Sequence, residues 1–88
     1  MLEPLHAAYD HVDPRERLSP REVEVLEMAS LGLTNVQIAG RLHVTIHAVK
    51  FHLAAIYRKL GVTNRTEAAV LFLRASSQGS GPPDAGRA

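Results

Sequence analysis

The stretch TNVQIAGRLHVTIHAVKFHLAAIYRKLG, residues 34–61, decides the fold. It opens with Thr34, followed three residues later by Gln37, a spacing typical of a capping box at the start of a helix. Thr45 is another residue of a type that caps helices, and Gly61 is of the type that ends them. The stretch therefore predicts two neighbouring helices, a short one from residue 35 and a longer one over about 46–59, joined by the dipeptide 43–44.

The longer of these helices has two chemically different sides. One side carries apolar residues at helical spacing: Val49, Leu53, Ile56 and Leu60. The opposite side carries His47, Phe51, Ala54 and Arg58, with Lys50 on one flank and with His52 and Lys59 on the other. This second side has no carboxylate, a property expected of a helix that enters a groove lined by phosphates. If the helix were rotated about its axis, Phe51 would instead lie in the core.

Two further helices flank this pair. The first begins with the capping box Ser19-Pro20-Arg21-Glu22, has Gly32 as its expected stop, and has apolar residues at helical spacing: Val25, Leu26, Ala29 and Leu33. The other begins at Asn64-Arg65-Thr66-Glu67, with Asn64 as the cap and Glu67 at the capping-box position. No segment alternates like a strand. Each helix has an apolar stripe to bury, so the sequence predicts an all-α four-helix bundle that contains a helix-turn-helix.

The two ends of the chain differ in composition from the middle. Residues 1–17 contain two prolines and mixed charges, which predict an N-terminal arm or linker with a helical turn near residues 5–9. Residues 76–88 read SSQGSGPPDAGRA, a composition typical of disorder. We therefore expect an arm over 1–17, a folded domain over 18–75 and a disordered tail over 76–88.

The overall composition indicates one small globular domain, with 45% hydrophobic and 22% charged residues. The net charge is only +1, but residues 1–40 carry seven acidic and three basic residues, whereas residues 41–74 carry six basic and one acidic. This asymmetry indicates a basic face for an anionic partner or, alternatively, no more than a solvated helix face. The apolar runs are too short to span a bilayer and no secretory signal is visible, so we expect a cytoplasmic protein without a membrane partner.

The residues that could carry metal or catalytic chemistry form no known constellation. There is no cysteine, and Thr45 breaks the helix between the two closest histidines, His43 and His47. Neither pairs with a nearby acid, whereas a metal site needs three or four converging ligands. Neither a Ser-His-acid arrangement nor a glycine-rich phosphate loop is present. We therefore expect no metal, no cofactor and no enzymatic activity.

An ordered series of short motifs resembles the LuxR-type DNA-binding domain, also called the FixJ or NarL type. The series runs through LSPRE (18–22), VL (25–26), GLTN (32–35), QIA (37–39), VKFH (49–52), IYRKLGV (56–62) and NRTEA (64–68). The resemblance covers about residues 18–75 and implies four helices, the third recognising DNA and the fourth supplying a dimer contact. It further implies a sequence-specific transcriptional regulator, either a stand-alone small regulator or the output domain of a longer response regulator.

The resemblance also implies which residues contact DNA. Lys50 matches the motif lysine, which contacts a base edge or a phosphate, and the start of the second helix can meet phosphate. The expected DNA-binding residues are Asn35, Gln37, Thr45, His47, Lys50, Phe51, Ala54, Arg58 and Lys59.

The sequence departs from the family at three positions on the third helix. Ala48 stands where threonine is common, and Phe51 and Ala54 stand where polar residues are frequent. Direct hydrogen-bond readout is therefore expected mainly from Lys50, His47 and Arg58.

The last helix has a second apolar side. Its core-facing residues are Ala68, Leu71, Phe72 and Ala75, and the other side carries Thr66, Ala69, Val70 and Leu73. A single small domain has no second core for this patch, which indicates a homodimer. With the resemblance, it implies two copies on a pseudo-palindromic double-stranded DNA site, in the cytoplasm of a bacterium and associated with the nucleoid. The alternative for this patch is a lone domain with a few tolerated surface aliphatics. A second class of function is a helical module that binds protein, such as RNA polymerase or a sigma-like partner, with weak or absent DNA contact, and the acidic N-terminal half could serve such a contact.

Overall fold

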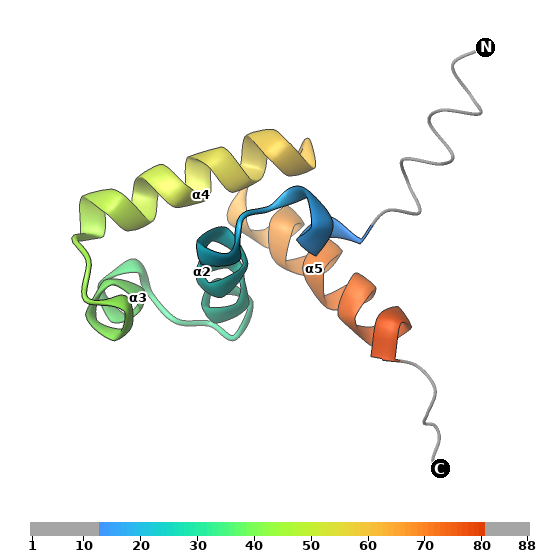
Figure 1. Cartoon of the computed structure of the whole chain (residues 1–88), viewed down its shortest axis with the longest axis horizontal. Helices are drawn as coiled ribbons and strands as arrows, with labels where there is room; N and C mark the ends of the chain where they lie inside the picture. The colour runs from blue at the N-terminus through green and yellow to red at the C-terminus, as the bar shows by residue number, and fades with distance from the viewer. Residues whose placement is uncertain (1–12, 81–88) are drawn as a thin grey trace.

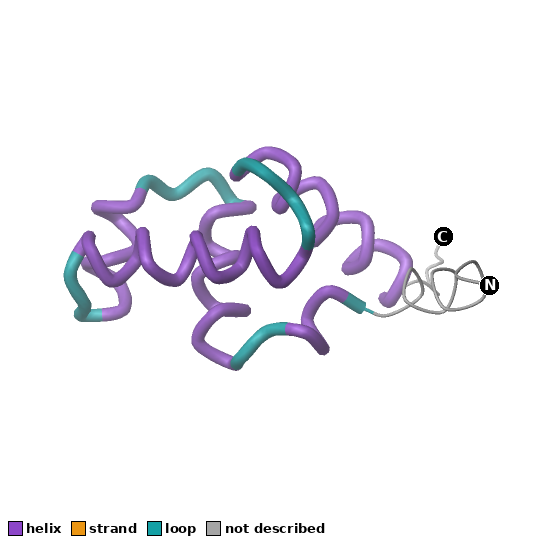
Figure 2. Tube along the Cα trace, turned by 90° about the horizontal axis from the view of Figure 1, so that it is seen from above, coloured by secondary structure: helices purple, strands orange, loops and turns teal. Residues whose placement is uncertain are grey.

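The computed structural model describes residues 13–80, with side chains to residue 76. A short 3-10 helix, η1 (Pro14–Arg17), precedes four α-helices: α2 (Pro20–Ser30), α3 (Asn35–Leu42), α4 (Ile46–Leu60) and α5 (Arg65–Ser80). Only helices and loops occur in this part of the chain (Figure 2). The predicted all-α class and the four α-helices are confirmed.

The predicted capping residues begin the helices as expected. The Ser19 Oγ accepts from the Glu22 N–H at 3.1 Å, and the Glu22 carboxylate accepts in return from the Ser19 N–H at 2.9 Å. Thr34 and Gln37 make the same reciprocal pair at the start of α3, with the same two distances. In each box, the backbone N–H of each residue donates to the side chain of the other residue. Because the two residues are only three positions apart, the local sequence is enough to specify these helix starts.

The start of α5 uses a different arrangement from the capping box that the sequence predicts. Asn64 does cap, since its Oδ1 accepts from the Glu67 N–H at 2.9 Å. The Glu67 carboxylate, however, accepts from the backbone N–H and the hydroxyl of Thr63, at 2.8 and 2.9 Å, one residue before the cap. Both hydrogen bonds lower the pKa of Glu67, and the bond from the Thr63 backbone N–H has the larger effect.

Residues with a positive φ follow the first three α-helices. Gly32 (φ +95°) and Gly61 (φ +70°) adopt it without the steric penalty that a Cβ would impose. His43, in the turn between α3 and α4, adopts φ +58° although it has a Cβ. The sequence-predicted stop at Gly32 holds, but Leu33 lies beyond the end of α2 and packs against the core from the loop.

The core lies where α2, α4 and α5 meet. The predicted stripe of α4 is buried, and it packs with Val25 and Leu26 of α2 and with Ala68 and Phe72 of α5. In Figure 1, α4 runs across α2, which is seen nearly end-on, while α3 and α5 lie toward opposite ends of α4. This arrangement covers one side of α4 and leaves the other side in solvent.

Both ends of the folded unit extend past the expected limits of 18 and 75. The helix η1 packs on α5 and α4, and its Pro14 is buried. The Arg15 guanidinium lies 4.9 Å from the centre of the Phe72 ring and donates to the Ser76 Oγ. At the C-terminal end, α5 continues to Ser80. The turn expected near residues 5–9, and the tail from residue 81, lie outside the described residues.

Candidate nucleic-acid interface

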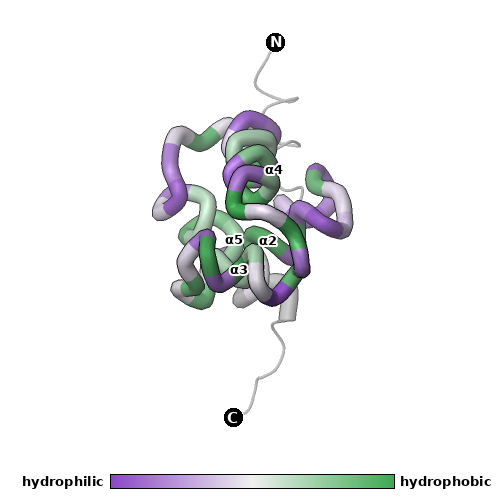
Figure 3. Tube along the Cα trace, turned by 90° about the vertical axis from the view of Figure 1, so that its left-hand side faces the viewer, coloured by the Kyte–Doolittle hydropathy of each residue, from purple (hydrophilic) through white to green (hydrophobic). Residues whose placement is uncertain are grey.

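The outward side of α4 is the surface that the sequence predicts to face DNA. Seen nearly along its axis in Figure 3, α4 lies above α2, α3 and α5, so the side turned away from them is open. Phe51 is 69% exposed, whereas Leu53 is 5% exposed. The predicted helical phase is therefore confirmed, and the alternative that places Phe51 in the core is wrong.

The predicted base-facing residues come together on this side. We use the name "α4 outward face" for the exposed residues His47, Lys50, Phe51, Ala54 and Arg58. Residues 47, 51, 54 and 58 follow one another at spacings of three or four, which places them in one row along the helix. Along the helix, Phe51 and Ala54 form an apolar centre, with the positive charge of Lys50 before it and that of Arg58 after it. The sequence of α4 contains no acidic residue.

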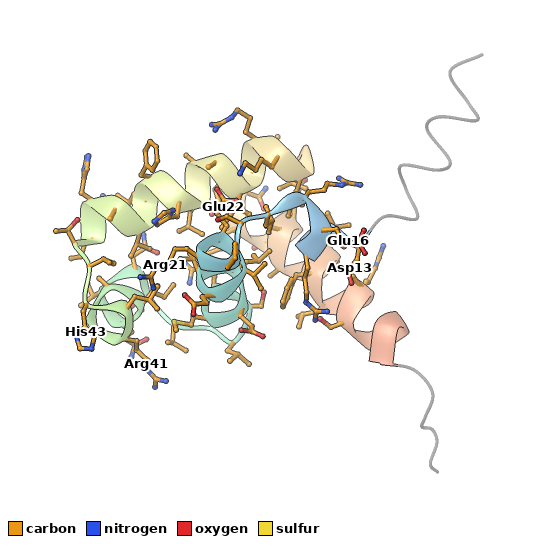
Figure 4. All side chains as sticks on the ribbon, viewed as in Figure 1. Asp13, Glu16, Arg21, Glu22, Arg41 and His43 are labelled. Atoms are coloured by element: carbon orange, nitrogen blue, oxygen red, sulfur yellow. The ribbon has the colours of Figure 1, made fainter. Side chains whose placement is uncertain are left out.

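Lys59, the remaining predicted contact on α4, is engaged within the protein. Its Nζ lies 2.8 and 3.1 Å from the two carboxylate oxygens of Glu22, whose side chain is 9% exposed. Figure 4 shows Glu22 directed from α2 toward α4. Burial by itself raises the pKa of Glu22, but the Lys59 hydrogen bond, the Ser19 backbone and the Lys59 charge outweigh burial and lower it. This ion pair ties the last turn of α4 to the first turn of α2.

The predicted contacts before α4 also have partners inside the domain. The Asn35 Oδ1 accepts from the Arg65 Nη1 at 2.8 Å, and Arg65 also donates to the Leu33 carbonyl. Gln37 accepts from the Thr34 N–H, and the Thr45 Oγ1 caps α4 by accepting from the Ala48 N–H at 3.0 Å. The oxygens of these residues organise the two helix starts, while the side chains of Gln37 and Thr45 remain exposed.

Two of these ties were not predicted from the sequence: the Glu22–Lys59 ion pair and the Arg65 bonds. For Arg65 a signal was available. A cation in the first turn of a helix is unfavourable toward the helix dipole, so its presence indicates a partner elsewhere. For Glu22 and Lys59 no local signal exists, because Glu22 is already accounted for by the capping box.

The second side of α5 is exposed as predicted. Ala68 and Phe72 are buried, whereas Val70 is 43% and Leu73 49% exposed, with Thr66 exposed and Ala69 half-buried between them. The sequence analysis missed three other exposed apolar residues: Leu31 (75%) at the end of α2, Val36 (63%) in α3 and Ile46 (42%) at the start of α4. None of the helices within residues 13–80 is long and apolar enough to cross a membrane.

Comparison with known proteins agrees with this geometry. A family model described as "Bacterial regulatory proteins, luxR family" matches residues 16–72. A probable transcriptional regulatory protein, SgaR of Hyphomicrobium methylovorum, is 48% identical over 61 residues, 69% of this chain and 29% of that protein. The nitrate/nitrite response regulator NarP of Escherichia coli is 42% identical over 62 residues, 70% of this chain and 29% of that protein. No solved structure matches significantly.

A third relative aligns over more of the chain. The DNA-binding transcriptional activator DevR/DosR of Mycobacterium tuberculosis is 35% identical over 85 residues, 93% of this chain and 39% of that protein. The chain therefore spans less than two fifths of the length of each of these three relatives. With the family match over most of the described residues, and with the predicted helices and caps in place, the chain belongs to the luxR family of bacterial regulatory proteins and carries that family's helix-turn-helix DNA-binding domain.

Proposed function

We propose that this domain binds a specific double-stranded DNA sequence by placing the α4 outward face in the major groove. One observation carries the proposal: a helix locked into the core by its apolar stripe presents Lys50 and Arg58 to solvent without any acid of its own. Such a helix can approach base edges while its cations offset phosphate charge. The proposal applies equally to a stand-alone regulator and to the output domain of a longer one, acting at the nucleoid in the bacterial cytoplasm.

The residues have distinct roles in this proposal. Lys50, His47 and Arg58 supply hydrogen bonds to base edges or phosphates, and Phe51 and Ala54 supply apolar contact. Asn35, Gln37 and Thr45 lie where the starts of α3 and α4 can approach the phosphate backbone. Lys59 contributes mainly through its ion pair with Glu22, which holds the angle of α4.

We also propose that two copies bind together through α5. The patch of Thr66, Val70 and Leu73, which are exposed, and Ala69, which is half-buried, lies on the side of the helix that the core does not use. A two-fold contact along this patch would present two α4 helices to the halves of a pseudo-palindromic site. Because the patch is small, the dimer is weak in solution and is strengthened by DNA. The exposed residues Leu31 and Val36 belong neither to the α4 outward face nor to the α5 patch, so they are candidates for a contact with RNA polymerase.

The decisive experiment is selection of bound fragments from genomic DNA, followed by affinity measurements over a salt series. Affinity should fall steeply with salt, because each phosphate contact releases counterions. Lys50→Ala should cost about 1–3 kcal/mol of binding and leave the fold unchanged. Arg41→Ala is the matched control, since Arg41 is an exposed cation of α3 that points away from α4 (Figure 4). Unchanged affinity in a folded Lys50→Ala variant would exclude α4 as the groove-binding helix.

A further inference from the structure

The centre of the α4 outward face is occupied by an aromatic ring that the fold does not use. Phe51 is the most exposed of the large apolar residues of α4, and it lies outside the core cluster formed by the stripe of the same helix. Ala54, one turn further on, is also exposed, so the apolar area continues along the row. Leaving a phenyl ring in water forgoes burial that stabilises a protein, so a partner that covers this ring, on the face proposed to meet DNA, would recover that burial.

The ring does not stand alone on the surface. The Phe51 and His52 rings meet edge to face, with centroids 6.1 Å apart and planes at 69°. His52 is half-buried beside the stripe, so this contact favours one direction for the Phe51 ring. On the same face, Lys50 and Arg58 carry the charge that can approach phosphates or guanine, with Phe51 and Ala54 between them along the helix.

The chemistry of the major groove limits what such a ring can cover. Base edges there present hydrogen-bond donors and acceptors, and the single apolar group is the C5-methyl of thymine. A phenyl ring laid over the N7 and O6 of guanine would remove their water and return no hydrogen bond. Laid over a methyl group, the same ring gains apolar contact and loses nothing.

We propose that Phe51, with Ala54 beside it, reads the C5-methyl group of a pyrimidine at the centre of each half-site. This inference rests on the proposed insertion of α4 into the major groove. The base recognised is thymine, and 5-methylcytosine presents the same methyl group in the same place. Binding should therefore depend on a single methyl group, and cytosine methylation at that position should strengthen it.

The test uses a duplex chosen by selection with the whole chain, in which each thymine is replaced in turn by deoxyuridine. At one position per half-site, loss of the methyl should weaken binding about fourfold, and about sixteenfold when both half-sites are changed. In a second duplex with a C·G pair at that position, replacing the cytosine by 5-methylcytosine should strengthen binding by a similar factor. Fluorescence anisotropy with labelled duplexes measures all of these ratios.

Variants assign the effect to the ring. Phe51→Ala should bring the thymine-to-uracil ratio close to one at that position, and Phe51→Leu should retain most of it. Lys50→Ala is the control, because it should weaken binding to both duplexes and leave their ratio unchanged. Equal affinity for thymine and uracil at every position would overturn the inference, and so would a ratio that persists in Phe51→Ala. If selection enriches no sequence at all, the proposed DNA binding itself fails, which is a separate and recognisable result.

Discussion

Replacing Glu22 by glutamine removes the negative charge of the ion pair that joins the start of α2 to the end of α4. Glutamine has nearly the same shape and can still accept from the Ser19 N–H, as Gln37 does from Thr34 at the start of α3. The capping box therefore survives the change. What is lost is the attraction between the Glu22 carboxylate and the Lys59 ammonium, so Glu22→Gln isolates the contribution of the ion pair.

The expected loss follows from the exposure of the two partners. Hydrogen bonds that involve charged groups contribute about 1.5–3 kcal/mol, and the Glu22 side chain is almost completely buried. The Lys59 side chain is 39% exposed and keeps part of its hydration, which reduces the contribution. We expect the free energy of unfolding to fall by about 1–2 kcal/mol, a change of about 4–16 °C in the thermal midpoint of a domain of this size.

The loss should depend on pH in a defined direction. The pKa of Glu22 is lowered in the folded protein, because the Lys59 bonds and the Ser19 N–H outweigh its burial. A carboxyl group with a lowered folded pKa contributes its full stabilisation above its unfolded pKa and loses it as the pH falls through the folded pKa. The stability difference between the native protein and Glu22→Gln should therefore be largest near neutral pH and vanish in acid.

Urea unfolding at neutral and acidic pH measures both quantities. Glu27→Gln is the matched control, because Glu27 is an exposed acid of the same helix and should change stability very little. Lys59→Gln should cost at least as much as Glu22→Gln, because it leaves the nearly buried carboxylate without its cation, and the double variant should cost no more than Lys59→Gln alone. Equal stability of Glu22→Gln and the native protein at neutral pH, or a difference that survives acidification, would refute the reasoning.

Four other substitutions test the remaining parts of the molecule. Leu53→Ala should destabilise by about 2–5 kcal/mol in urea through a cavity, whereas Phe51→Ala should change stability by less than about 0.5 kcal/mol; the reverse order would contradict the burial of α4. Leu73→Asp places a charge on the exposed side of α5, so it should abolish self-association in analytical ultracentrifugation and weaken binding to a full site more than to a half-site. Equal losses on both sites would exclude this side of α5 as the interface. Arg15→Ala should speed amide hydrogen exchange in the last turns of α5 and leave α4 unchanged, while exchange identical to that of the native protein would show that the segment over 13–17 does not hold α5.

Most of the fold could be predicted because its decisive interactions are local. Each cap joins residues three apart, and the apolar stripe of α4 repeats every three or four residues. These patterns can be read without knowing how the helices cross. The exposed positions of α4 could be predicted from the same periodicity, because the residues opposite a buried stripe face the solvent. The composition of the last residues led to an early end for α5, because serine and glycine say little about a helix that a tertiary contact supports.

The sequence by itself determined the class of fold, the order and phase of the helices and the family, because these depend on spacings within one or two helical turns. Only the tertiary structure decided which charges remain free for a partner. Lys59 and Glu22 are 37 positions apart, Arg65 and Asn35 are 30 apart, and Arg15 reaches Ser76 across 61. Such contacts depend on the angles at which helices cross, and those angles are set by the packing of the whole core. For that reason the sequence placed Lys59 with the DNA-binding residues, whereas the packed domain places its ammonium group on a buried carboxylate.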